Sequence, residues 1–222
     1  MKKPFVALTV VAIIVLALAS VGPFTDPGIK TGGLHTGDAS AATTDVNGTW
    51  TIIPNAGDNT TSVGYTFHEL LPGESRSTSG TTHDVTGEVT VDGGTLTAGN
   101  VTVDVNGLQT DVEKRDINVR RTILHTDDYP TATFTVSTPV DITGVPDNGE
   151  PGTVTVTGML NLHGVEKEVT AEFDVLRTGN RLVIAGTVPI NRIDFGVETP
   201  DFVAAKVDED GELNIRLAME KH

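Results

Sequence analysis

The sequence has no cysteine, few aromatic residues and half as many basic as acidic residues, and each shortage excludes a class of protein. Without cysteine the chain forms no disulfide scaffold, no thiol nucleophile and no zinc–cysteine site. A net charge of −15 and a pI near 4.6 argue against nucleic-acid binding, because a phosphate backbone requires a basic surface. An aromatic fraction of 5% is low for a filled β-core of this size, in which large rings normally supply much of the buried area.

The first 24 residues have the pattern of a membrane-targeting segment. Two lysines precede an apolar run over residues 5–21 that contains only two polar residues. The run approaches the roughly 20 residues that a helix needs to cross a bilayer, which favours an uncleaved signal anchor. The small residues in Ala17-Leu18-Ala19 also fit the cleavage site of a signal peptide, so residues 1–24 are either an anchor or a cleaved leader.

The lysines at the start of the chain predict where the rest of it lies. Basic residues before an apolar segment stay in the cytoplasm, so we expect the remainder to be exported. The protein is then held at the cell membrane with an extracytoplasmic domain, or secreted if the leader is cleaved. Residues 25–46 are rich in Gly and Pro and have no periodic apolar face, which predicts a flexible linker before a domain at 47–222.

The domain at 47–222 has the composition and the alternation of antiparallel β-strands. The chain holds 34 threonines and 28 valines, the residue types of half-buried strands. Apolar and polar residues alternate in several runs, and one apolar face with one wet face indicates antiparallel sheet. Eight or nine strands are expected in a sandwich or a closed barrel. The predicted strands are 48–53, 62–67, 85–91, 101–106, 133–137, 153–157, 169–175, 181–188 and 212–219.

Two stretches of the domain break this alternation. Residues 112–124 have an imperfect helical spacing of apolar side chains with Asp111 as a candidate N-cap, which predicts one short helix near an end of the barrel. The sequence from 72 to 80 is rich in Gly and Ser and is expected to be a flexible connection.

The chain shows no pattern of catalytic or metal-binding residues. None of the six histidines has a partner at metal-ligand spacing, and neither a Gly-x-Ser-x-Gly elbow nor a phosphate-binding Gly-rich loop is present. We therefore predict no metal, no cofactor and no enzyme activity. Four charged residues remain as candidates for polar fastening at the barrel end or for contact with a polar ligand head: Arg115, Asp116, Arg192 and Asp194.

Three blocks of the sequence resemble, in the same order, segments of the YceI-like family of polyisoprenoid-binding lipid-barrel proteins. The first runs from Thr-Asp-Val-Glu-Lys-Arg-Asp at 110–116 to Asp-Tyr-Pro at 128–130. The second, 158–167, is similar to the family's G-x-L-T-I-x-G-V-T-K segment, with Asn161 in place of threonine, and the third, 191–196, to its N-R-x-D-F-G segment. The resemblance covers about 50 to 220. It implies an all-β, eight-stranded antiparallel, lipocalin-like barrel that holds a long isoprenoid chain, and it supplies no catalytic mechanism.

The start of the domain departs from the family's commonest pattern. Where many members begin with I-D-x-x-H-S-x-V-x-F, this chain has Pro-Asn-Ala-Gly-Asp-Asn-Thr-Thr-Ser-Val-Gly-Tyr at 54–65, without the histidine, and a long loop is expected to follow at 69–83. This departure resembles a membrane-anchored branch of the family. The residues that differ from the family's pattern are those of the strand and loop at one mouth of the expected barrel.

The inward positions of the predicted strands are mostly aliphatic, so a hollow barrel would suit an apolar chain that is held by burial. A polyprenyl or quinone-type lipid is the expected partner, with the membrane reached through the N-terminal segment. The alternatives are an enzyme that acts on a lipid head group at the barrel mouth, and a structural or stress-related surface protein whose core is filled by the same residues. The candidate lumen residues are Val63, Val89, Val101, Val103, Val105, Phe134, Val136, Val154, Val156, Val169, Ala171, Phe173, Leu182 and Ile184.

Overall fold

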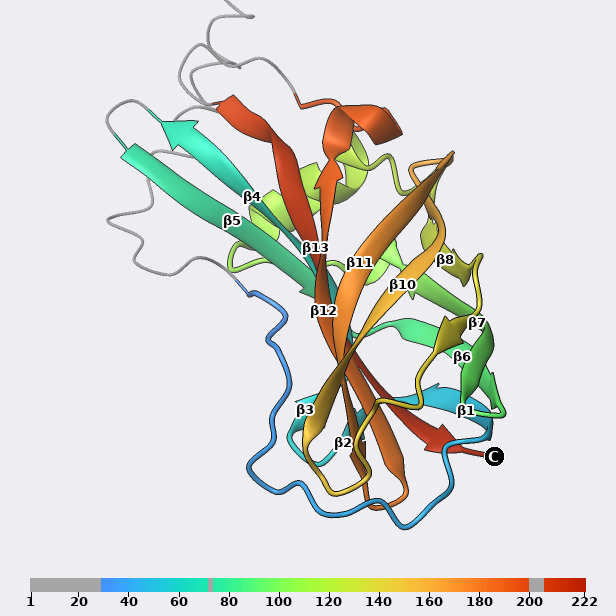
Figure 1. Cartoon of the computed structure of the whole chain (residues 1–222). Coiled ribbons are helices and arrows are strands. Elements are labelled where there is room, and N and C mark those ends of the chain that lie inside the picture. Colours follow the sequence, from blue (N-terminus) through green and yellow to red (C-terminus); the bar gives the residue numbers. More distant parts are fainter. Residues whose placement is uncertain (1–28, 72–73, 200–205) are drawn as a thin grey trace, which may run out of the picture.

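The computed structural model describes residues 29–71, 74–199 and 206–222 (Figure 1). The segment at 1–24, predicted as an anchor or leader, lies outside these residues. Within the described part of the chain, no helix combines the length and the apolar character needed to span a bilayer.

Eight antiparallel strands form a closed barrel, as the family resemblance predicted. The barrel closes because the first strand pairs with the last, with Trp50 opposite Lys221 and Ile53 opposite Ala218. All pairings around the barrel are antiparallel. In spatial order the strands are β1 (Gly48–Ile53), β6 (Val85–Asp92), β7 (Thr95–Asp104), β8 (Thr131–Val136), β10 (Pro151–Leu162), β11 (Val165–Thr178), β12 (Arg181–Asn191) and β13 (Lys206–Lys221).

Each of the nine predicted strands corresponds to a strand of the structure, and the alternation of side chains explains why. In β10, Val154 and Val156 are buried while Thr153 and Thr155, which alternate with them, are exposed. The same two-residue period places one set of side chains inside the barrel and the other in solvent. The short strands β2 (Asn55–Ala56), β3 (Asn59–Thr60) and β9 (Val140–Asp141) lie outside the barrel path.

The predictions of a flexible connection at 72–80 and of a long loop at 69–83 were wrong for residues 74–80 and for residues 69–71 and 74–82, respectively, which lie in strands. Residues 74–80 belong to β5 (Glu74–Thr82), which pairs with β4 (Ser62–Leu71). Strand β4 in turn pairs with the first part of β13, and β1 pairs with the last part. The buried side chains on the face turned away from the cavity are polar here: the Thr66 hydroxyl lies 2.8 Å from the Ser79 hydroxyl and donates to Asn214 Oδ1 at 2.6 Å. Because these polar groups satisfy one another across strands, hydrophobic periodicity does not reveal the strand.

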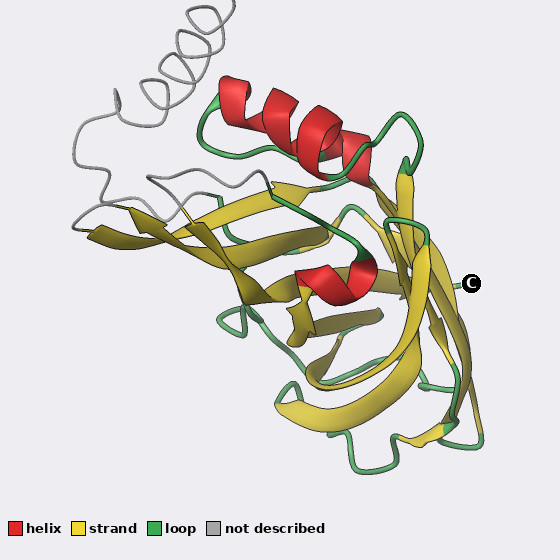
Figure 2. Cartoon of the chain, turned by 90° about the horizontal axis from the view of Figure 1, so that it is seen from above, coloured by secondary structure: helices red, strands yellow, loops and turns green. Residues whose placement is uncertain are grey.

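The predicted helix is present, although it begins differently. Helix α2 (Glu113–Asn118) continues into a π-helical turn, η2 (Val119–Ile123), at one end of the barrel (Figures 1 and 2). Its N-cap is Val112 and not Asp111, whose carboxylate pairs with Arg115 instead. The short helix η3 (Arg192–Phe195) lies at the same end, which we call the helical end. The opposite end, with the β11–β12 turn and the end of β13, is called the Trp50 end.

Residues 29–46, the described part of the predicted linker, lie along the barrel surface. The amides of Ala42 and Thr43 donate to the carbonyls of Asp147 and Gly179, both at 2.7 Å. Leu34 and Ala39 pack against a small buried cluster on the barrel, and backbone hydrogen bonds and a few polar side chains hold the rest of the segment in place. One of them, Lys30, pairs with Glu212 at 2.6 Å.

Candidate functional site

An apolar cavity of about 300 Å³ occupies the barrel and reaches its helical end. Its walls come from β4–β8, β10–β13 and the short helix η1 (Val105–Gly107), and residues of α2, η2 and η3 cover it. The exposed Asn118 on α2 and the partly exposed Thr199 form part of its rim.

The structure brings most of the predicted lumen residues together on this wall. Val154, Ala171 and Leu182 are the exceptions: they are buried in the main core cluster without lining the cavity. The predicted residues that line it are Val63, Val89, Val101, Val103, Val105, Phe134, Val136, Val156, Val169, Phe173 and Ile184. A role of these side chains in holding a ligand stays a prediction.

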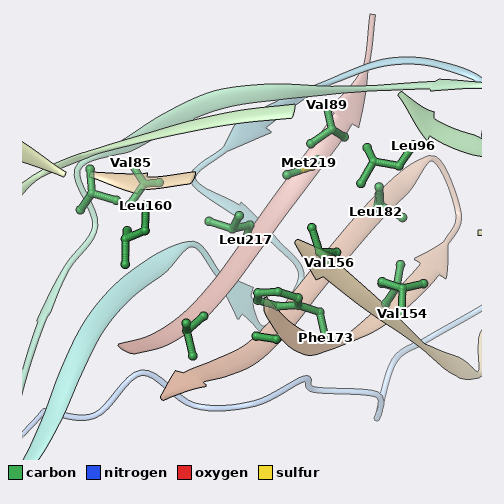
Figure 3. Close-up of a cluster of buried hydrophobic side chains, with 14 of the residues drawn as sticks. Val85, Val89, Leu96, Val154, Val156, Leu160, Phe173, Leu182, Leu217 and Met219 are labelled. Carbon is green, nitrogen blue, oxygen red and sulfur yellow. The ribbon is translucent and has the colours of Figure 1, made fainter. Parts of the chain in front are cut away.

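Core side chains fill the Trp50 end of the barrel. The Trp50 ring is 2% exposed and its indole N–H donates to the Val46 carbonyl at 2.8 Å. Val154 and Leu182 belong to the same packed cluster, as Figure 3 shows for side chains drawn together from several strands. The barrel is therefore filled at one end and hollow at the other.

The aromatic rings leave this hollow open because they lie against glycines of neighbouring strands. A Cβ atom on Gly186 would stand 2.6 Å from Cδ1 of Phe173, its paired residue on β11. A Cβ atom on Gly80 would likewise stand 2.8 Å from Cε1 of Tyr65. A ring that occupies the place of a missing side chain follows the wall and leaves the centre of the barrel free.

Sequence reasoning missed further lining residues on most of the strands, and two groups of them are instructive. One is the inward face of β13, where Leu213, Ile215, Leu217 and Met219 alternate with Asn214, Arg216 and the small Ala218. That alternation is visible in the sequence and identifies the face. The other group, Val119 and Ile123 from the helical cover, lines the cavity only because the tertiary fold places η2 over the barrel, and no local pattern reveals it.

Of the four charged candidates, Arg115 and Arg192 line the cavity, whereas Asp116 and Asp194 do not. Asp116 is buried and accepts hydrogen bonds from the amide and hydroxyl of Thr110, at 2.7 and 2.6 Å. Arg115 pairs with Asp111, and the exposed Asp194 pairs with Lys167 at 3.0 Å.

Arg192 forms three hydrogen bonds to backbone carbonyls. Its buried guanidinium donates to the carbonyls of Val197, Val207 and Asp208 at 2.8, 3.3 and 3.1 Å. The side chain therefore ties η3 to the start of β13. This is the polar fastening that one of the two interpretations expected.

Tyr65 lines the cavity with its ring, and its hydroxyl forms no hydrogen bond with the described residues. Its ring packs against a cluster formed by Val105, Leu108 and Ala132, and the hydroxyl is buried. Burial raises the pKa of Tyr65 far above the usual value for tyrosine, so the group stays neutral.

A comparison with known protein families identifies residues 50–219 as a YceI-like domain. A search of curated proteins finds no significant match. Among solved structures, a polyisoprenoid binding domain from Saccharophagus degradans implicated in plant cell wall breakdown matches with a TM-score of 0.60 and 18% identity, over 78% of this chain and 98% of that one.

Two further solved structures share the fold. BcnA of Burkholderia cenocepacia matches with a TM-score of 0.57 and 21% identity, over 71% of this chain and 94% of its own. A mutant YceI protein of Campylobacter jejuni matches with a TM-score of 0.51 and 19% identity, over 64% of this chain and 85% of its own. With the family match spanning most of the barrel, the protein belongs to the YceI-like family.

Proposed function

We propose that the protein binds the apolar chain of an isoprenoid lipid, of polyprenyl or quinone type, inside the barrel. The observation that carries this proposal is the cavity of about 300 Å³, whose wall is formed mainly by Val, Leu, Ile and Phe side chains. The YceI-like family assignment and the fold shared with a polyisoprenoid binding domain support the same conclusion.

Burial supplies the binding energy in this account. Each methylene group moved from water into the cavity contributes about 0.8 kcal/mol, which corresponds to about fourfold in affinity. The volume lies near the lower end of the range for ligand pockets, roughly 300–1,000 Å³. The cavity therefore suits a short isoprenoid chain, or part of a long one whose remainder leaves through the helical end.

The membrane is the proposed source of the lipid. The apolar run at 5–21 and the two lysines before it support attachment to the cell membrane, with the barrel on the extracytoplasmic side. Cell fractionation followed by N-terminal sequencing tests this part. Recovery of the intact chain in the membrane fraction supports an anchor, recovery of a chain without residues 1–24 supports secretion, and a cytoplasmic intact chain contradicts both.

The alternative of an enzyme at the barrel mouth finds no support in the site. It requires Arg115, Asp116, Arg192 and Asp194 to face one open pocket. Arg115 and Arg192 do line the cavity, but Asp116 and Asp194 do not, and each of the four has a partner within the protein. The alternative of a filled core applies only to the Trp50 end of the barrel. The hollow at the helical end favours binding.

Native mass spectrometry of the purified protein, with lipid identified after solvent extraction, tests the proposal. We expect one apolar isoprenoid per chain in the wild type and none in a Val156→Trp variant, because Val156 lines the cavity and an indole there fills it. Thr155→Trp places the same ring on the solvent side of β10 and should retain the lipid. Empty wild-type protein that also takes up no added isoprenoid would contradict the proposal.

A further inference from the structure

Four of the five large apolar side chains that are exposed among the described residues lie at the helical end of the barrel. Ile117 on α2 and Ile193 on η3 are nearly half exposed, at 45% and 46% (Figure 2). The other two are Leu70, near the end of β4, and Tyr129, which follows η2. The cavity opens at the same end, with Asn118 on its rim. Apolar side chains exposed around the mouth of a lipid cavity indicate contact with another apolar phase.

The outward face of α2 and η2 is basic, unlike the chain as a whole. Lys114 and Arg121 are exposed about one turn before and one turn after Ile117, and neither forms an ion pair within the described part of the chain. Glu113 is the acidic residue exposed beside them, so the face keeps a net positive charge. An isoleucine between two basic side chains is typical of a helix that lies on an anionic lipid surface.

The sides of the barrel have the opposite charge. The outer face of β11 exposes four carboxylates, those of Glu166, Glu168, Glu172 and Asp174. An anionic lipid surface repels this face and attracts the outward face of α2 and η2. The charge distribution therefore favours one orientation, with the helical end toward the lipid.

The start of the described chain reaches the barrel close to the helical cover. The Thr31 hydroxyl lies 2.7 Å from the Thr81 hydroxyl, and Thr81 exchanges two backbone hydrogen bonds with Gln109, four residues before α2. Residues 22–28 connect residue 29 to the apolar run at 5–21, and a connection of this length spans at most roughly 30 Å. An anchored chain therefore keeps the helical end within reach of the bilayer.

We propose that the outward face of α2 and η2, with Lys114, Ile117 and Arg121, docks on an anionic lipid bilayer and turns the mouth of the cavity toward it. This inference rests on the proposed function and deepens it, since it names the surface through which the lipid enters. The basic side chains attract the lipid head groups, and Ile117 enters the interface between them. An isoprenoid chain then passes from the bilayer to the cavity without crossing water, which is the costly step for an apolar molecule.

The absence of cysteine allows a single fluorescent probe to be attached at a chosen position of the full chain. Ile117→Cys and Thr153→Cys are each labelled with the dye NBD and reconstituted in phosphatidylcholine vesicles that contain about one-third phosphatidylglycerol. Thr153 is the control, because it is exposed on β10 near the Trp50 end. Nitroxide-labelled lipid should quench the probe at position 117 at least about threefold more strongly than the probe at position 153.

Charge reversal tests what holds this surface on the bilayer. Lys114→Glu combined with Arg121→Glu should lower the quenching at position 117 at least about twofold in the anionic vesicles. In vesicles of phosphatidylcholine alone, the same double variant should leave the quenching unchanged. Neither residue lines the cavity, so the amount of isoprenoid that co-purifies with the double variant should equal that of the wild type in native mass spectrometry.

Equal quenching at positions 117 and 153, or quenching at 117 that charge reversal does not reduce, would overturn the docking surface. Isoprenoid that still co-purifies in either case upholds the proposed function. Strong, charge-dependent quenching at 117 in a protein that takes up no isoprenoid would uphold the docking surface and overturn the proposed function.

Discussion

The ring of Phe173 on β11 lies against Gly186, the residue paired with it on β12, where a Cβ atom would stand only 2.6 Å from Cδ1 of the ring. Both residues belong to the wall of the barrel beside the cavity. The glycine accommodates the ring, and the ring in turn covers backbone that would otherwise be bare. The low aromatic content of the chain and the hollow barrel are thus connected, because the few rings follow the wall.

Gly186→Ala should therefore both destabilise the protein and reduce its binding of lipid. The new methyl group meets the Phe173 ring and, at 2.8 Å, the Glu172 carbonyl oxygen, so the strand must shift and the ring must move toward the cavity. We expect a loss of about 1–3 kcal/mol in the free energy of urea unfolding, the usual cost of overpacking, together with weaker farnesol binding. Gly144→Ala is the control, since no atom lies within 4 Å of its Cβ position. Equal effects of the two substitutions would contradict this account of the wall.

Arg192→Met should be strongly destabilising. The substitution keeps much of the side-chain volume but removes the donors to the carbonyls of Val197, Val207 and Asp208. We expect a loss of about 2–4 kcal/mol in unfolding free energy, because buried carbonyls are left without partners. Arg121→Met, on the exposed side of η2, should stay within about 0.5 kcal/mol of the wild type. A near-neutral Arg192→Met would show that the guanidinium does not fasten the helical end.

Lys30→Met should make stability less dependent on acid pH. The hydrogen bond from Lys30 is the main cause of a lowered pKa of Glu212, against the opposing effect of burial. A carboxyl group with a lowered pKa in the folded state stabilises the protein fully above its ordinary value, 4.5, and loses that contribution as the pH falls through the lower folded pKa. The pair is partly exposed, so we expect a loss of only about 0.5 kcal/mol at pH 7.

The measurement is urea unfolding at neutral pH and at a pH below the folded pKa of Glu212, which an NMR titration of its carboxyl carbon supplies. The difference between wild type and Lys30→Met should vanish at the acid pH, and the pKa of Glu212 should rise in the variant. Lys114→Met, which removes an exposed lysine that forms no ion pair with the described residues, should leave that pKa unchanged. A pKa of Glu212 that Lys30→Met does not alter would contradict the assignment.

The strands with one aliphatic and one polar face could be predicted from the sequence because their burial follows a two-residue period. Val154 and Val156 on β10 show the pattern, and both are buried. Strand β5 escaped prediction because it is polar or glycine on both faces: Thr78 lines the cavity, and Ser79 meets the Thr66 hydroxyl on the opposite face. Such a strand has the same composition as a surface loop. Closure of the barrel depends on pairing between residues as distant as Trp50 and Lys221, which only the family resemblance implied.

The extent of the cavity was harder to predict than its composition. Val154 and Leu182 have the same inward orientation along their strands as residues of the wall, but they lie in the packed cluster of the Trp50 end. Periodicity assigns a face of a strand and does not say how far along that face the core is filled. The helical cover, with Val119 on η2, depends on tertiary packing that no local pattern records.

The central claim is that the cavity holds an apolar isoprenoid chain by burial, and the most direct test is the dependence of affinity on chain length. Titration of the wild-type protein with geraniol, farnesol and geranylgeraniol adds five carbons at each step. At about 0.8 kcal/mol per buried methylene, complete burial of one unit sets an upper limit of about 4 kcal/mol. The account predicts a gain of at least about tenfold per unit until the cavity is full, and a plateau beyond that length. An affinity that does not change with chain length, or no binding at any length, would contradict it.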